Sequence, residues 1–205
     1  MKVEYAPDSL MADGSSTRLL SFKFPIETDQ ELTKITLETS NGTFKESASN
    51  SVTLDFIKLS DDEDYRVSEA TLVASNVAND FKVKVKLQNY SKELIIPAKV
   101  ATVTDVALGS ETFYISNDTT QIVNFEATLL STTGMASKGQ PVTFTGPTSS
   151  GILSTTSGTA DKEGKAKFQY VFTDIGYTGG PLVFEAIIDS AGVPKIATKT
   201  IEVFP

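Results

Sequence analysis

The stretch TADKEGKAKFQYVF, residues 159–172, decides how this chain is expected to fold. Its second part alternates polar residues with four apolar ones: Ala166, Phe168, Tyr170 and Phe172. A half-buried β-strand requires this period of two, whereas a helix would spread the same residues around its circumference. The stretch therefore predicts a strand in which at least one of Phe168 and Tyr170 belongs to the core.

The polar part of this stretch, residues 161–165, has three interpretations: a calcium loop, a phosphate loop or a turn. An EF-hand calcium loop needs oxygen ligands at alternating positions, but only Asp161 and Glu163 are available, with lysines crowded around them. A phosphate-binding P-loop needs Ser or Thr after the lysine, where Ala166 stands. The favoured interpretation is a hairpin turn in which Gly164 takes a positive φ.

The same period of two recurs along the whole chain. It predicts strands at 18–24, 34–39, 51–56, 69–75 and 81–87 in the first half, and at 121–130, 141–145, 166–172, 181–188 and 196–204 in the second. Clusters of Gly, Pro, Ser and Thr lie between these strands, and no helical period does. We therefore expect an all-β protein built from β-sandwiches.

The two halves of the chain resemble each other. Residues 11–24 match 116–129, the segment ITLETSNGTF matches VTFTGPTSSGIL, and residues 81–100 match 182–201. Three matches in the same order, about 100 residues apart, indicate a tandem duplication. We place one domain at residues 1–100 and the other at 101–205, and because no Gly/Ser linker separates them we expect a stiff end-to-end arrangement.

Composition excludes several classes of function. The chain has 205 residues, a net charge of −8 and no Cys, His or Trp. The acidity disfavours binding to nucleic acid or to an anionic membrane surface. The missing residue types exclude thiol nucleophiles, Cys/His zinc sites and imidazole-based triads, so we expect no cofactor. No segment reaches the roughly 18 consecutive apolar residues of a membrane span, and residues 1–14 carry no apolar h-region of a signal segment.

The second half resembles the bacterial immunoglobulin-like (Ig-like) domains that occur in tandem in invasin and intimin type adhesins. The resemblance rests on the polar turn ND, on KGQPVTF at 138–144, on Gly-x-Leu at 151–153 and on TADKEGKA at 159–166. In the first half, the Ala-Asp-Gly turn at 12–14 matches the opening of such a domain. The resemblance implies two tandem Ig-like β-sandwich domains, with no catalysed reaction.

The resemblance also implies a place at the bacterial cell surface or outside the cell, as part of a larger exported protein. The expected function is that of an adhesin stalk, spacer or adhesion module with an unidentified protein or glycan ligand. A carbohydrate-binding accessory module of a surface glycan-uptake system is the alternative, and an unrecognised catalytic domain is a third. For a glycan module, the candidate aromatic residues are Tyr90, Tyr114, Tyr170 and Tyr177.

Two charged segments are further candidates for binding. The cluster of Asp61, Asp62, Glu63 and Asp64 offers carboxylates to a metal ion, although adjacent residues of a loop point in different directions and favour a solvated loop. The segment FKVKVKL, residues 81–87, places three lysines on one face. We interpret them as the solvent face of a strand, or as the protection of an edge strand, in preference to a site for an acidic partner.

Overall fold

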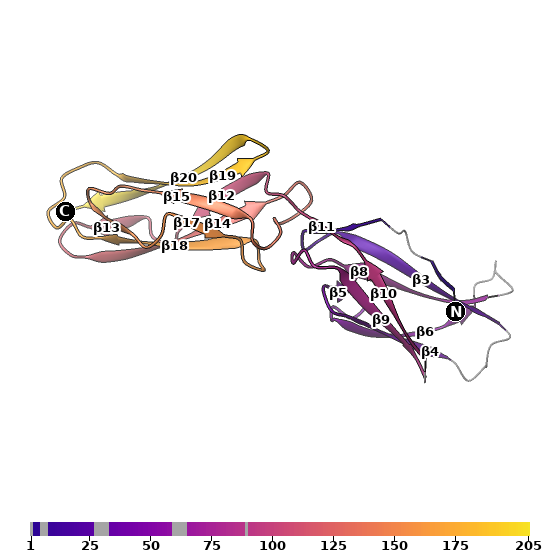
Figure 1. Ribbon diagram of the computed structural model, residues 1–205. Helices are drawn as coiled ribbons and strands as arrows, with labels where there is room; N and C mark the ends of the chain where they lie inside the picture. Colours follow the sequence, from indigo (N-terminus) through magenta and orange to yellow (C-terminus); the bar gives the residue numbers. More distant parts are fainter. Residues whose placement is uncertain (1, 5–7, 27–32, 59–64, 89) are drawn as a thin grey trace. The chain divides into compact units, whose positions relative to one another are not determined.

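The fold is known from a computed structural model, which describes residues 2–4, 8–26, 33–58, 65–88 and 90–205. The contacts divide the chain into two compact units, Met1–Val100 and Ala101–Pro205. Both units consist of strands, as Figure 1 shows. The expected all-β fold of two tandem Ig-like β-sandwiches is confirmed. Within the described ranges, no helix is long and apolar enough to cross a membrane.

The first unit packs two antiparallel sheets against each other. One has the order β1-β3-β8-β5, with β7 also beside β8, and the other has the order β10-β9-β4-β6; β2 and β11 form a separate parallel pair. The strands are β1 (Lys2–Glu4), β2 (Leu10–Ala12), β3 (Thr17–Pro25), β4 (Lys34–Thr39), β5 (Thr43–Phe44), β6 (Ser51–Asp55), β7 (Ile57–Lys58), β8 (Tyr65–Val73), β9 (Phe81–Leu87), β10 (Tyr90–Ile96) and β11 (Ala98–Val100).

The second unit has the same two-layer plan. Its sheets have the orders β12-β14-β18-β16 and β13-β20-β19-β15-β17. The strands are β12 (Asp105–Gly109), β13 (Tyr114–Ser116), β14 (Gln121–Leu130), β15 (Pro141–Thr145), β16 (Gly151–Leu153), β17 (Ser157–Thr159), β18 (Lys165–Phe172), β19 (Leu182–Ser190) and β20 (Val193–Phe204).

Strand register repeats between the two units. Leu37 of β4 pairs with Val85 of β9, and Phe144 of β15 pairs with Ala186 of β19. These are the positions that the sequence repeat superimposes. In both units a short strand near the start of the unit also pairs in parallel with the last strand: β2 lies beside β11, and β13 lies beside β20. The two units therefore share one topology, as a duplication would produce.

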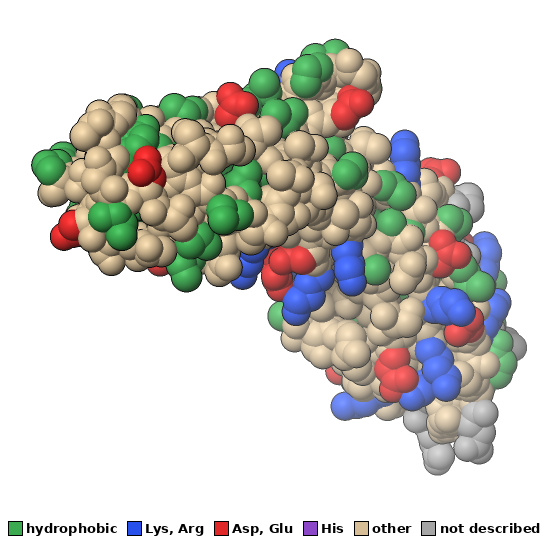
Figure 2. All heavy atoms as spheres, turned by 60° about the vertical axis from the view of Figure 1, so that its left-hand side comes forward, with side chains coloured by type: hydrophobic (Ala, Val, Ile, Leu, Met, Phe, Trp, Pro, Cys, Tyr) green, Lys and Arg blue, Asp and Glu red, His purple; other side chains and the backbone are tan. Residues whose placement is uncertain are grey.

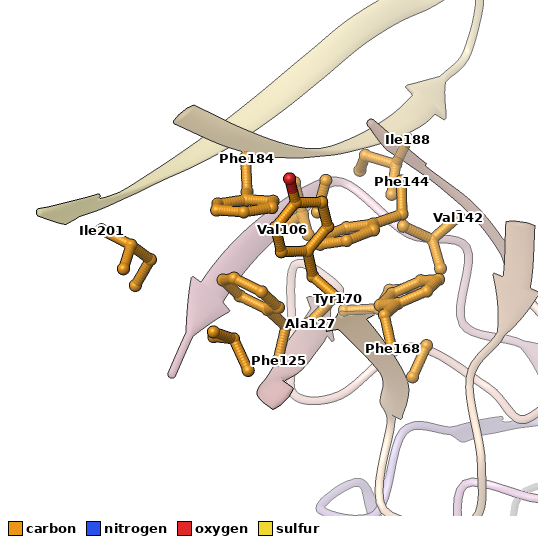
Figure 3. Packing of buried hydrophobic residues seen from close by; sticks show 14 of the residues in the cluster. Val106, Phe125, Ala127, Val142, Phe144, Phe168, Tyr170, Phe184, Ile188 and Ile201 are labelled. Carbon is orange, nitrogen blue, oxygen red and sulfur yellow. The ribbon is translucent and has the colours of Figure 1, made fainter. Parts of the chain in front are cut away.

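Aromatic rings fill the core of the second unit (Figure 3). The rings of Phe144 and Phe168 stack with centroids 4.4 Å apart, and Phe184 lies 4.5 Å from Phe125 and 4.8 Å from Tyr170. All five side chains are buried. Full burial of such a side chain contributes roughly 1.5–3 kcal/mol, so this ring cluster is a main source of the unit's stability.

The stretch 159–172 follows its prediction in part. Phe168 and Tyr170 are both core residues, and the Tyr170 hydroxyl forms a hydrogen bond of 2.8 Å with the Ser150 hydroxyl. Gly164 has a φ of 71°, as the turn requires. The hairpin is wrong, however, because β17 before the turn and β18 after it belong to opposite sheets. The turn carries the chain from one layer of the sandwich to the other.

The Asp161 side chain organises this turn. Its Oδ1 accepts hydrogen bonds from the backbone N–H groups of Glu163 at 2.8 Å and Lys165 at 2.9 Å. Desolvation raises the pKa of Asp161, but the two N–H donors, together with the charges of Lys167 and Lys165, hold that pKa below its ordinary value. The carboxylate is thus engaged by the backbone of the turn.

The lysine segment 81–87 forms β9. Lys82 and Lys84 are exposed on its outer face, and Lys86 forms an ion pair of 2.5 Å with Glu38 of β4. The solvent-face interpretation is confirmed, but the edge-strand interpretation is wrong because β9 lies between β10 and β4. The edge strands of this sheet are β10 and β6.

Candidate functional site

Exposed apolar side chains gather on the second unit. Of the 14 large apolar side chains exposed in the described residues, ten belong to it and four to the first unit. Figure 2 shows the same contrast, with hydrophobic groups spread over the second unit and lysines concentrated on the first. Because single exposed apolar residues are normal, only those that form a cluster point to a binding surface.

One such cluster lies where the chain crosses between the two sheets of the second unit. Strand β12 leaves the first sheet at Gly109, and β13 joins the opposite sheet at Tyr114. We call residues 109–116 the crossover segment. The Ser110 hydroxyl donates a 2.8 Å hydrogen bond to the backbone oxygen of Asn124, and it accepts one of 3.2 Å from the N–H of Thr112. These bonds fix the start of the segment against β14.

Two exposed aromatic residues in mutual contact, Tyr114 and Phe204, form what we call the aromatic patch, and Phe113 is exposed beside Tyr114 in the chain. The exposed fractions of Tyr114, Phe204 and Phe113 are 69%, 53% and 64%. The rings of Tyr114 and Phe204 meet edge to face with centroids 6.0 Å apart. The Lys199 ammonium lies 4.2 Å from the centre of the Phe113 ring, close enough for a cation–π contact. The rings are therefore held in place although most of their surface faces solvent.

A shallow hollow accompanies the Tyr114–Phe204 pair. Its volume is about 480 Å³, and its lining adds Ile115, Ser116 and Gln121. The Gln121 side chain donates a hydrogen bond of 3.5 Å to the backbone oxygen of Ser116, which links β14 to the end of the crossover segment. Aromatic faces thus lie beside an amide and a hydroxyl.

A second, larger hollow, which we call the polar groove, lies along the start of the crossover segment. Its volume is about 840 Å³. It is lined by Gly109, Ser110, Glu111, Thr112, Asn124, Phe125, Glu126, Ser154, Lys167, Phe168 and Gln169. Since Phe125 and Phe168 are buried, the exposed lining is mainly amide, hydroxyl and charged side chains.

Polar side chains of the groove are ordered by contacts among themselves. The Gln169 amide donates a 2.9 Å hydrogen bond to Oδ1 of Asn124, across β18 and β14. The Ser154 hydroxyl accepts a 3.0 Å bond from the backbone N–H of Gln169. Glu126 forms a 2.7 Å ion pair with Lys165, and this partner raises the pKa of Lys165. The groove and the aromatic patch share the crossover segment, so we treat them together as the crossover site.

The residues predicted from sequence have different outcomes. Asp61, Asp62, Glu63 and Asp64 lie outside the described residues, so their metal-binding role stays a prediction. In the described part of the chain, no group of three or more acidic residues is arranged to hold a metal ion. Tyr170 is buried, Tyr177 packs against Phe172, and Tyr90 is exposed in the first unit. Of the four tyrosines, only Tyr114 lies in the aromatic patch.

Sequence reasoning missed Phe113, Phe204 and the polar groove. The exposure of Phe204 could have been predicted from strand alternation. Ile201 is buried and Val203 is half-buried on the inner face of β20, so Phe204 belongs to the outer face. The groove could not be predicted in this way, because it depends on where the chain changes sheets.

Solved structures with a similar fold include three bacterial proteins. Invasin, a bacterial integrin-binding protein, matches 99% of this chain at 16% identity with a TM-score of 0.56. The adhesin InvE of Yersinia pseudotuberculosis matches 97% at 15% identity with a TM-score of 0.48, and the D00–D0 domains of intimin match 100% at 15% with 0.40. No protein-family model and no curated protein matches the chain.

These likenesses concern the fold. The chain spans 58% of the InvE chain, 39% of the invasin chain and 100% of the intimin fragment. The match to invasin, together with the strand order of both units, defines the class: a tandem pair of Ig-like β-sandwiches with the invasin fold. The resemblance predicted from the sequence is thereby confirmed at the level of fold.

Proposed function

We propose that this chain is a non-enzymatic adhesion module of a larger exported bacterial protein, at the cell surface or outside the cell. Its second unit contacts the ligand through the crossover site. The observation that carries the proposal is the aromatic patch, two rings in contact that are each more than half exposed, at the end of the segment whose start lines the polar groove. Exposed aromatic clusters of this kind are typical of interfaces.

A plain stalk or spacer is the nearest alternative. Such a module needs stable sandwiches and stiff connections, but it needs no hollow and no clustered exposed rings. Polar residues in place of Tyr114 and Phe204 would make the chain more soluble, because neither side chain is buried in the unit. Their presence on the surface therefore favours a module that itself makes contact.

Charge distribution agrees with a contact through the second unit. That unit contains only six of the 18 Lys and Arg residues, namely Lys138, Lys162, Lys165, Lys167, Lys195 and Lys199. A surface with few lysines and many exposed apolar groups resembles the core of a protein interface, from which lysine is depleted. The first unit, which carries the other twelve, is the better suited to face solvent.

Binding to cells tests the proposed function. The purified chain, fluorescently labelled, is titrated onto cultured mammalian epithelial cells, and unlabelled chain is added as competitor. We expect saturable binding that the unlabelled chain displaces. Binding that rises linearly with concentration and that the unlabelled chain does not displace, on every cell type tested, would contradict the proposal. The chain would then be a spacer.

A further inference from the structure

The class of ligand that the crossover site can bind follows from the chemistry of the side chains that line it. We propose that the site binds an uncharged oligosaccharide, which lies along the crossover segment with one sugar against the aromatic patch and others in the polar groove. This inference rests on the proposed function of the second unit and specifies what that unit contacts.

The groove has the size of a site for a small or chain-like ligand. Its volume of about 840 Å³ lies within the range of roughly 300–1,000 Å³ that is typical of ligand pockets. A protein partner instead needs a well-packed surface of about 800 Å² on each side. A hollow of this size is much smaller than such a surface, whereas a short sugar chain can lie in it.

Amide groups of the groove match the hydroxyl groups of a sugar. The bond from Gln169 to Asn124 uses one N–H of Gln169 and one lone pair of Asn124. It leaves the Asn124 amide N–H groups and the Gln169 carbonyl oxygen for other partners. A sugar hydroxyl both donates and accepts, so neighbouring hydroxyls of one ring can satisfy both groups. Because the two amides already fix each other, little side-chain freedom is lost on binding.

Charges in the groove nearly cancel. Glu126 is paired with Lys165, which leaves Glu111 and Lys167 as one charge of each sign. A site for an acidic polysaccharide or a phosphorylated ligand would instead gather cations. The balance favours a ligand that is recognised by hydrogen bonds and carries no charge.

The aromatic patch adds an apolar contact at the other end of the site. One face of many sugar rings presents only C–H groups, which pack on an aromatic ring, while the hydroxyls at the ring edge reach polar groups. Tyr114 and Phe204 offer such rings beside the Gln121 amide and the Ser116 hydroxyl. Since residues 109–112 line the groove and 114–116 line the second hollow, one extended ligand can follow the segment through both.

The experiment combines cell binding with site variants of the whole chain. Exhaustive periodate oxidation of the epithelial cells cleaves the ring vicinal diols of their surface sugars, as well as the side chains of sialic acids, and leaves protein backbones intact. The Asn124→Ala and Gln169→Ala variants remove one amide each, and Gln140→Ala, in the loop just before β15 of the other sheet, is the matched control. Loss of a ligand hydrogen bond at each amide should weaken binding by about tenfold.

In parallel, amide spectra of the isotope-labelled chain are recorded with maltotetraose, chitotetraose and lacto-N-neotetraose at millimolar concentration. We expect cell binding to fall after periodate and in both groove variants but not in the control, and at least one sugar to shift the side-chain amide signals of Asn124 and Gln169. If no sugar of this panel binds, the cell-binding result alone decides whether the oligosaccharide proposal holds.

Cell binding that survives periodate, or that is unchanged in both groove variants, overturns the oligosaccharide proposal. If such binding still depends on Tyr114, the proposed adhesion function stands with a different ligand. If the chain binds no cells before oxidation, the proposed function fails and the oligosaccharide proposal fails with it.

Discussion

Replacing Gly164 by alanine tests the account of the turn that leads into β18. Gly164 has a φ of 71°, a region that residues with a Cβ enter at a cost of about 1–2 kcal/mol. A Cβ built at this position lies 2.9 Å from Cβ of Met135 and 3.3 Å from the backbone oxygen of Leu129. Both distances are shorter than ordinary van der Waals contact, so the end of β14 and the loop that carries Met135 must shift.

The expected destabilisation combines these two effects. Overpacking a fitted site typically costs about 1–3 kcal/mol, and alanine recovers about 0.4–1 kcal/mol by restricting the unfolded chain. The net loss for Gly164→Ala is therefore about 3 kcal/mol, which lowers the Tm of a domain of this size by roughly 10–20 °C.

Differential scanning calorimetry of the whole chain measures this loss in the transition of the second unit. Gly192→Ala is the matched control, because Gly192 has a φ of 83° and open space around its Cβ position. It should show only the conformational cost, about 1 kcal/mol. Equal shifts for the two variants, or a shift below about 3 °C for Gly164→Ala, would refute the close contact with Met135.

Three further predictions concern the second unit and the linkage. Tyr170→Phe leaves the buried Ser150 hydroxyl without its partner and should cost about 1–3 kcal/mol in chemical denaturation, while the double variant with Ser150→Ala should recover part of that loss. Because the pKa of Asp161 is lowered in the folded state, its charge stabilises the unit above the unfolded pKa and ceases to do so as pH falls through the folded value. Asp161→Asn should therefore destabilise at neutral pH, with a difference in Tm from the natural chain that shrinks at pH values below the ordinary Asp pKa; a constant difference would contradict this. The end-to-end arrangement predicted from the absence of a Gly/Ser linker between the two domains is tested by small-angle scattering, where a compact particle would count against it.

The long strands were predictable because burial on one face of a strand depends only on residue parity. Phe81, Val83 and Val85 alternate with lysines, and all three are buried as the pattern requires. The short strands β13, β16 and β17, each of three residues, contain too few positions to show a period. Their pairing is set by partners far along the chain, which no local pattern encodes.

The turn at Asp161 and the crossover site show what the alternation of polar and apolar residues cannot predict, namely which sheet a strand joins. A turn sequence specifies that the chain reverses, but the packing of the two layers decides whether the next strand joins the same sheet or the opposite one. The hairpin expected at Gly164 was wrong for this reason. The groove beside Ser110 was missed for the same reason, because it exists only where β12 ends and β13 joins the other sheet.

Binding by the aromatic patch is the central claim, and cell binding of two double variants of the whole chain tests it most directly. Tyr114→Ser with Phe204→Ser removes the patch, whereas Ile152→Ser with Val183→Ser removes two exposed apolar residues elsewhere in the same unit. Exposed substitutions of this kind should change stability by no more than about 0.5 kcal/mol each, which calorimetry verifies. We predict that the patch variant loses at least about tenfold in affinity for epithelial cells, with the control within about twofold of the natural chain. Equal affinities of the two variants would contradict the account.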